Sequence, residues 1–406
     1  MRSLICLMAL FSAAGLARAE TLPAWQPGYL DIHHIGTGRG NATFIVMPDG
    51  TSMLIDAGAS TSAPEVSAIA RPDASRRPGE WIARYIKRHA PRAMPQRLDY
   101  TLVTHFHPDH LGNAGLDAPT SRHGDYRLSG VMEVAESIDI GKLLDRGFPD
   151  YSYPEPIRKM GGFADNYLAF VAARGRLGQA VERIAVGKTD QIRALHGPAP
   201  GFSVRTIAAN GEVWNGAQAA RNLFPALSSL APMDYPNENN CSIAIKVNYG
   251  KFAYFTGGDL TSHTFDGELP WRDVLGPAAK AAGPVDVATA DHHGMYDGLS
   301  ADVVRSLRPR AWVIPAWHIT HPDLLQLERM FSTRLYPGPR SVYANGVVAA
   351  NELANRRLLA PASSLDGHIV VRVAPGGASY SIFVTDNRDE RDTVVRADGP
   401  HVAGQR

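Results

Sequence analysis

The alternation of apolar and polar positions in the first part of the chain predicts a series of short strands. Apolar stretches at 29–35, 42–47 and 52–55 are separated by the turn-forming runs 36–38 and 48–50. Glycine, proline and aspartate in these runs are typical of tight turns between strands. We therefore expect the chain to begin its folded part as consecutive β-strands.

The same pattern continues along most of the chain and defines two β-rich halves. Further strands are predicted at 98–103, 202–207, 242–247, 252–255, 285–288, 311–314, 369–373 and 380–384. Helical spacing of apolar residues predicts helices at 80–88, 163–184 and 322–330. The stretch from 111 to about 200 is interpreted as a long insertion, and the charged tail 389–406 is expected to be frayed.

The N-terminal residues have the pattern of a targeting segment. Arg2 precedes an apolar run from Leu4 to Leu16, and 17–19 reads Ala-Arg-Ala, a small-x-small cleavage site. We therefore expect residues 1–19 to be a signal peptide, with 20–388 as one domain in the periplasm or secreted. No later apolar stretch has the length that a membrane-spanning helix needs.

Composition narrows the class of protein further. The 406 residues are 44% hydrophobic and 20% charged, which is typical of globular proteins with a large core. A formal net charge of +1 gives no broad electrostatic footprint for nucleic acid. Of the two cysteines, Cys6 lies in the expected signal peptide, so only Cys241 remains and no internal disulfide is expected.

The stretch 104–110, Thr-His-Phe-His-Pro-Asp-His, carries the strongest chemical signal. Side chains two apart in an extended segment point to the same side, so His105 and His107 can bind one cation. Pro108 favours a turn and a helix start, which directs Asp109 and His110 toward a second position. Imidazole and carboxylate together suit zinc. The alternative is an ordinary polar loop rich in histidine.

Polar residues also follow other predicted strands. Asp259 follows 252–255, and His292 and His293 follow 285–288. A sheet places such strand ends along one edge, where these groups can converge with the histidine cluster. His318 and His321 follow 311–314; they are either part of the same site or packed or surface histidines.

In these stretches the chain resembles the metallo-β-lactamase superfamily, and within it the hydrolase-like domain of ComEC-type DNA-uptake proteins. The matching segments, in the family's order, are 32–42, 54–58, 104–112, 239–242, 256–260 and 291–294. The resemblance implies an α/β fold, a four-layer αββα sandwich with a long insertion after the histidine cluster. It also implies a site for two metal ions on one edge of the sandwich.

The resemblance implies roles for the candidate ligands. His105 and His107 would bind one metal, and Asp109 and His110 the other. Asp259 would bridge the two ions. The ions would be zinc, with manganese or iron as alternatives.

The last ligand and the missing ligand are both open. His292 or His293 would be the last ligand, and we prefer His292 because it comes first after the strand. The superfamily usually supplies another histidine before the strand that leads to the bridging aspartate. Here 236–240 reads Pro-Asn-Glu-Asn-Asn, similar to the Asn-rich segment of ComEC-type domains. The first metal site would then be weaker, be filled by water or asparagine, or hold a metal other than zinc.

These expectations together predict an exported metal-dependent hydrolase. A water between two cations would attack the substrate, with Asp109 orienting it and His321 donating a proton or holding a phosphate. The ComEC-type resemblance favours a small-molecule or phosphodiester substrate. Alternatives are a lactonase or β-lactamase, and a non-catalytic envelope module that keeps a metal for structure. Asn41 and Asp56 are expected to orient ligand histidines, with a turn residue at the end of a strand as the alternative for Asp56.

Overall fold

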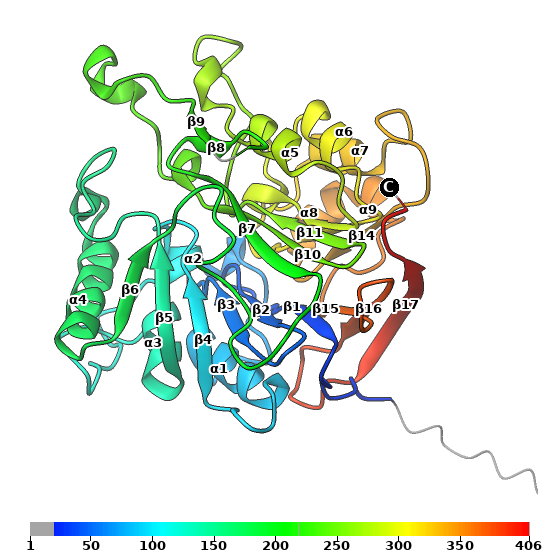
Figure 1. Ribbon diagram of the computed structural model, residues 1–406, viewed down its shortest axis with the longest axis horizontal. Helices are drawn as coiled ribbons and strands as arrows, with labels where there is room; N and C mark the ends of the chain where they lie inside the picture. Colours follow the sequence, from blue (N-terminus) through cyan, green and yellow to red (C-terminus); the bar gives the residue numbers. More distant parts are fainter. Residues whose placement is uncertain (1–19, 218, 406) are drawn as a thin grey trace, which may run out of the picture.

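Two β-sheets lie face to face in the computed structural model, with helices on both outer faces (Figure 1). The structure describes residues 20–217 and 219–405; the expected signal peptide, 1–19, lies outside them. The predicted four-layer αββα sandwich is confirmed. Among the described residues, no helix is long and apolar enough to cross a membrane.

The first sheet contains the N-terminal strands, the strands around the histidine cluster and the C-terminal strands. Its nine strands follow the order β17 (Val394–Val402), β16 (Ser379–Thr385), β15 (His368–Val373), β1 (Leu30–His34), β2 (Thr43–Val46), β3 (Ser52–Ile55), β4 (Arg97–Leu102), β5 (Asp139–Asp145) and β6 (Ala180–Arg183). Pairing is antiparallel from β17 to β3 and parallel from β3 to β6.

The second sheet is formed by the later part of the chain. Its eight strands follow the order β14 (Ser341–Ala344), β13 (Ala311–Ile314), β12 (Val287–Thr289), β11 (Phe252–Thr256), β10 (Ala244–Tyr249), β7 (Phe202–Ala209), β8 (Glu212–Trp214) and β9 (Ala220–Asn222). Strands β11 to β14 are parallel, so their carboxyl ends lie along one edge.

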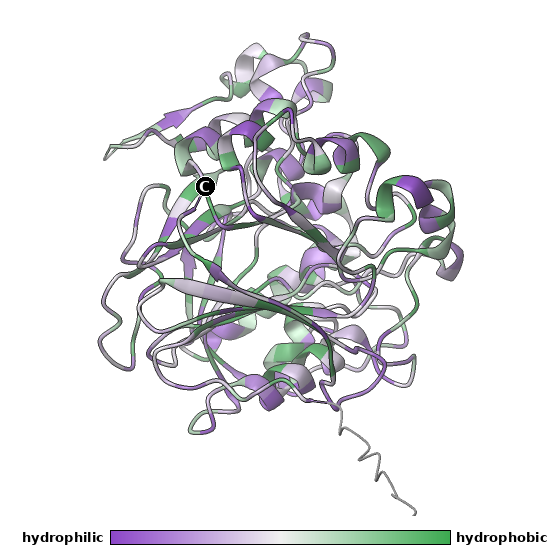
Figure 2. Cartoon of the chain, turned by 90° about the vertical axis from the view of Figure 1, so that its right-hand side faces the viewer, coloured by the Kyte–Doolittle hydropathy of each residue, from purple (hydrophilic) through white to green (hydrophobic). Residues whose placement is uncertain are grey.

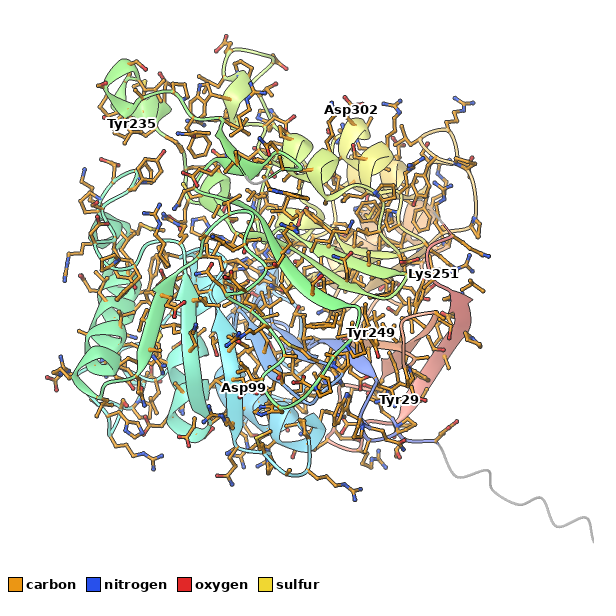
Figure 3. The ribbon with its side chains drawn as sticks, viewed as in Figure 1. Tyr29, Asp99, Tyr235, Tyr249, Lys251 and Asp302 are labelled. Carbon is orange, nitrogen blue, oxygen red and sulfur yellow. The ribbon has the colours of Figure 1, made fainter. Side chains whose placement is uncertain are left out.

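Strands near the centre of the first sheet are buried on both faces. On β2, Ile45 packs into the core between the sheets, whereas Phe44 packs outward beneath the helices. Such strands are apolar throughout rather than alternating. Tyr249 at the end of β10 also joins the two halves, since its hydroxyl donates to Gly28 O and accepts from Gly376 N, both at 2.8 Å (Figure 3).

The helices form the two outer layers, which Figure 2 shows above and below the sheets. The first sheet is covered by α1 (Pro78–His89), α3 (Gly130–Ser137) and α4 (Gly162–Arg176), and the second by α5 (Leu275–Ala282), α6 (Ala301–Leu307) and α7 (Leu324–Phe331). Three shorter helices are α2 (Pro108–Leu111), α8 (Ala349–Ala354) and α9 (Arg356–Leu359).

Three expectations about the chain's organisation need correction. Much of the stretch 111–200 belongs to the first sheet and its helical layer, because it contributes α3, β5, α4 and β6. The helix expected at 163–184 ends at Arg176, and β6 follows after Gly178, whose φ of +68° favours glycine. Part of the C-terminal tail, expected to be frayed, forms β17 instead, paired with β16.

Candidate metal centre

The candidate ligands come from three segments that meet at one edge of the sandwich. The histidine cluster follows β4, and α2 begins at Pro108 as the sequence predicts. Asp259 follows β11, and His292 and His293 lie in the short η7 helix (Asp291–Gly294) after β12. The carboxyl ends of these strands thus bring together residues that are up to about 190 positions apart in the chain.

The first turn of α2 is held by very close backbone packing. Asn41 N donates to Asp109 O at 2.8 Å, and Gly58 N donates to Asn41 O at 2.8 Å. A Cβ atom placed on Gly58 would lie 2.0 Å from Asp109 O, so only glycine fits at this position. The loops after β1 and β3 therefore fix the backbone of the metal-ligand candidates.

One set of donor atoms, here called the Asp109 group, consists of Asp109, His110, Asp259 and His293. His110 Nε2 lies 3.1 Å from both His293 Nε2 and Asp259 Oδ1, and 3.7 Å from Asp109 Oδ2. His293 Nε2 lies 3.0 Å from Asp109 Oδ2 and 3.4 Å from Asp259 Oδ1. The four donors come from three segments, since Asp109 and His110 are adjacent, and their ligand atoms lie within 4.8 Å of one another.

A second set, the His105 group, consists of His105, His107 and Asp259. His105 Nε2 lies 3.1 Å from His107 Nδ1 and 3.6 Å from Asp259 Oδ2. Asp259 therefore belongs to both groups, with Oδ1 facing the Asp109 group and Oδ2 facing the His105 group. This is the arrangement of a carboxylate that bridges two cations.

The donor separations fit a tetrahedrally bound transition metal. Bonds of about 2.0–2.2 Å place tetrahedral ligand atoms about 3.3–3.6 Å apart. The seven donor separations given above run from 3.0 to 3.7 Å, and all donor atoms of each group lie within 4.8 Å of one another. Nitrogen and carboxylate donors at this spacing suit zinc, and they also accept manganese or iron.

The electrostatics of the Asp109 group also favour a cation. Although burial acts in the opposite direction, the Asp259 carboxylate and the hydrogen bond with Asp109 raise the pKa of His293 to about 9. Burial alone would also lower the pKa of His110, but Asp259 and neighbouring carboxylates raise that pKa well above 6.5. Without a cation, these imidazoles hold protons that balance the carboxylates, and a metal ion can take their place.

The two histidines of the Asp109 group are oriented through their other ring nitrogen. His110 Nδ1 lies 2.7 Å from Asp56 Oδ2, and His293 Nδ1 lies 2.8 Å from Pro315 O. Asp56 also accepts from Asn41 Nδ2 at 3.0 Å and from Thr104 N at 2.8 Å. Outer contacts of this kind fix the ring so that Nε2 faces the metal.

The structure differs from our preference between the adjacent histidines. We preferred His292 over His293 as the last ligand, but His293 is the one that belongs to the Asp109 group. His292 contacts Asp297 and Asn239 instead. Both residues have positive φ, 51° for His292 and 54° for His293, and this backbone conformation could not be inferred from their order in the sequence.

The segment after β13 lies against the Asp109 group. The buried His321 ring stacks on His293 with centroids 4.6 Å apart and planes 9° apart. His318 is partly exposed, and its backbone N–H donates to His321 Nδ1 at 3.3 Å. Trp317 Nε1 donates to Asp109 Oδ2 at 3.2 Å. We did not single out Trp317, although its place beside the two histidines was a usable signal.

A buried ion pair that we did not predict from the sequence contacts the backbone of the His105 group. Arg146 pairs with Glu238 and is 1% exposed. Glu238 Oε1 accepts from Phe106 N at 2.8 Å, between the two histidines of the cluster. No motif marks this pair, because Arg146 follows a strand that the pattern did not predict.

Comparison with known families supports the superfamily fold. The model described as the metallo-beta-lactamase superfamily matches residues 35–129, which contain the histidine cluster but make up less than half of the chain. The two sheets with their outer helices are consistent with the αββα sandwich of that superfamily. No curated protein matches, and the ComEC-type resemblance stays a prediction.

Several solved structures are similar to the chain at low identity. A mutant of CmlA beta-hydroxylase shares 14% identity over 86% of this chain and 54% of that chain, with a TM-score of 0.39. Zinc-bound PqqB from Methylobacterium extorquens shares 14% identity over 62% of this chain and 59% of that chain, with a TM-score of 0.31. YhfI from Bacillus subtilis, a metallo-beta-lactamase fold protein, shares 10% identity over 85% of this chain and 99% of that chain, with a TM-score of 0.36. The chain spans less than two thirds of the length of the first two of these proteins. Similarity at these TM-scores supports no conclusion about activity.

Proposed function

We propose that the protein is an exported metal-dependent hydrolase with a two-cation site, and that phosphodiesters are its favoured substrates. The observation that carries the proposal is the position of Asp259. One of its carboxylate oxygens faces the Asp109 group and the other faces the His105 group. Two cations about 3.5–4 Å apart lower the pKa of a bound water and stabilise the attacking and leaving oxygens.

Access from solvent favours an enzyme over a module that keeps a metal only for structure. His105, His110 and His293 are buried, whereas His107 and Asp109 are partly exposed. A catalytic metal site needs a position that water or substrate can reach. A substrate can therefore approach from the side of His107 and Asp109.

The residues around this opening support hydrolysis. Asp109 presents a carboxylate that Trp317 holds by a hydrogen bond, so it can orient the attacking water as well as bind metal. His321 stacks directly on His293, where it can contact a substrate oxygen. Preference for a phosphodiester over a lactone or a β-lactam rests on the ComEC-type resemblance, which is an argument by analogy. Export to the periplasm or medium rests on the sequence pattern of residues 1–19.

The experiment combines metal content with hydrolysis by the purified protein. Zinc, manganese and iron are measured by mass spectrometry. Turnover is measured on bis(4-nitrophenyl) phosphate, a lactone and a chromogenic β-lactam. Asp259→Asn removes the bridging charge, and Asp302→Asn is the matched control, because Asp302 is 86% exposed on α6 (Figure 3).

Each outcome decides between the alternatives. Two metals per chain and phosphodiester turnover, lost in Asp259→Asn but kept in Asp302→Asn, would support the proposal. Two metals per chain with turnover of only the lactone or the β-lactam would support a metal-dependent hydrolase but contradict the phosphodiester substrate. At most one metal and no turnover of any reporter would favour the structural module.

A further inference from the structure

The two adjacent histidines of η7 lie on opposite sides of the bridging carboxylate. His293 Nε2 lies 3.4 Å from Asp259 Oδ1, and His292 Nε2 lies 3.9 Å from Asp259 Oδ2. The same Oδ2 atom lies 3.6 Å from His105 Nε2. His292 therefore faces the side of Asp259 that belongs to the His105 group, which has three donors, although its Nε2 is not within 4.8 Å of all three and must move closer to share a cation with them.

The backbone explains how neighbouring residues reach opposite sides. Both histidines are in the left-handed region, at φ 51° and ψ 42° for His292 and φ 54° and ψ 18° for His293. This conformation is strained for residues other than glycine, so two such residues in succession must be held by their surroundings. Their ring centroids are 6.4 Å apart, which separates the two imidazoles across Asp259.

The orientation of His292 follows the pattern of the other candidate ligands. Its Nδ1 lies 2.6 Å from Asp297 Oδ1, so Nδ1–H donates to that carboxylate and Nε2 keeps its lone pair. Asp56 holds Nδ1 of His110 in the same way, and Pro315 O holds Nδ1 of His293. A carboxylate on the far nitrogen is typical of histidines that bind metals.

Asn239 is the competing donor at this position. Its Nδ2 lies 3.1 Å from His292 Nε2, and its Oδ1 is buried without a hydrogen-bond partner. Asn239 belongs to the segment 236–240, where the expected histidine is missing. An imidazole nitrogen is a better zinc ligand than a neutral amide oxygen, which favours His292 over Asn239 as the ligand.

We propose that His292 is the third histidine of the His105 group and that Asp297 positions it. The Asp-His-His-Gly segment would then supply one ligand to each cation, and His292 would replace the histidine missing from 236–240. This inference rests on the proposed two-cation site.

The test measures how many cations each variant binds, and how tightly, independently of any activity. Zinc stoichiometry and affinity are determined by calorimetry and by competition with a chelator, and Co²⁺ binding is followed by its visible absorption. The variants are His292→Ala, Asn239→Ala and Asp297→Asn. His196→Ala is the control, because His196 also contacts a carboxylate, that of Asp99 at 2.8 Å, but neither His196 nor Asp99 is a candidate metal ligand.

We expect wild type, Asn239→Ala and His196→Ala to bind two cations. His292→Ala should keep one and lose the second, and Asp297→Asn should weaken the second by about 10–100-fold. Because Asp297→Asn keeps the ligand and the side-chain volume, it tests the idea even if His292→Ala misfolds.

Three results would overturn the inference. Two cations with unchanged affinity in His292→Ala would exclude His292 as a ligand. Loss of the second cation in Asn239→Ala, with both retained in His292→Ala, would assign the position to Asn239. Fewer than two cations in wild type would overturn the two-cation site itself, which separates failure of the proposed function from failure of this inference alone.

Discussion

Asp56 accepts a hydrogen bond from Nδ1 of His110 at 2.7 Å, and the opposite nitrogen of that ring faces the candidate metal position. Both residues are at most 1% exposed. Asp56 also accepts from the backbone and hydroxyl of Thr104, each at 2.8 Å, so it cannot turn away from the ring. This single carboxylate therefore links the end of β3 to the start of the histidine cluster.

Asp56→Asn should weaken zinc binding by about 10–100-fold, because the amide cannot hold the His110 ring as the charged carboxylate does. Chelator competition would measure the affinity, and far-ultraviolet circular dichroism would verify folding. Asp302→Asn on α6 is the control for loss of one carboxylate. Unchanged affinity in folded Asp56→Asn would show that Asp56 serves the turn after β3 and not the metal site.

Glu238→Ala should destabilise the protein by about 3–5 kcal/mol, because it leaves the Arg146 guanidinium buried without its charged partner. Urea unfolding followed by tryptophan fluorescence would measure this free energy. The double variant Arg146→Met/Glu238→Leu should be less destabilised than Glu238→Ala, since no unpaired charge remains. Equal losses in both variants would mean that the contact of Glu238 with Phe106 N dominates instead.

Stability should fall as the pH is lowered from 7 to 5, because three buried histidines resist protonation. Burial lowers the pKa of His33 to about 4 and the pKa of His34 and His368 to about 3. Above pH 6.5, the usual pKa of histidine in an unfolded chain, these three side chains are neutral in both the folded and the unfolded state. Below that pH, only the unfolded chain binds these protons. Each of these histidines should therefore lower the free energy of unfolding by about 2 kcal/mol at pH 5.

Urea unfolding at a series of pH values would measure this slope. In His34→Gln the loss between pH 7 and 5 should be smaller by about 2 kcal/mol, whereas His123→Gln, on the surface, should match wild type. A flat pH profile for wild type would show that these histidines are protonated within the folded protein.

Metal binding should release protons at pH 7. Without a cation, nearby carboxylates raise the pKa of His293 to about 9 and hold that of His110 well above its usual range. A metal ion requires both rings as neutral ligands, so their protons must leave. Calorimetry in buffers of different ionisation enthalpy would count them. No proton release in wild type, or the same count in His110→Ala, would contradict this account.

The sequence was most informative where local pattern and burial agree. Strands β3 and β13 have the predicted bounds, because each is a short apolar run between clear turns. Strand β17 was missed because it lies at the edge of its sheet, where charged side chains can face solvent. β6 was missed for the same reason, since it is the opposite edge.

The candidate site shows the same division. The cluster 105–110 is contiguous in sequence, so its spacing alone predicted a metal site. Trp317 and Glu238 act through long-range contacts that no local pattern encodes. The roles of His292 and His293 depend on two successive positive φ angles, which are set by the surrounding loops and not by the residues themselves.

His321→Gln should lower kcat by about 10²–10³-fold while leaving both cations bound, because His321 is expected to donate a hydrogen bond to the reacting group. Its Nδ1 accepts from His318 N, so the proton lies on Nε2. Burial and the neighbouring His293 hold its pKa well below 6.5, so the ring is neutral at pH 7 and donates without ionising. The pH profile of kcat/KM should therefore keep its shape in the variant. Loss of a cation, or loss of one limb of the pH profile, would instead show that His321 supports the metal site or acts as a titrating acid.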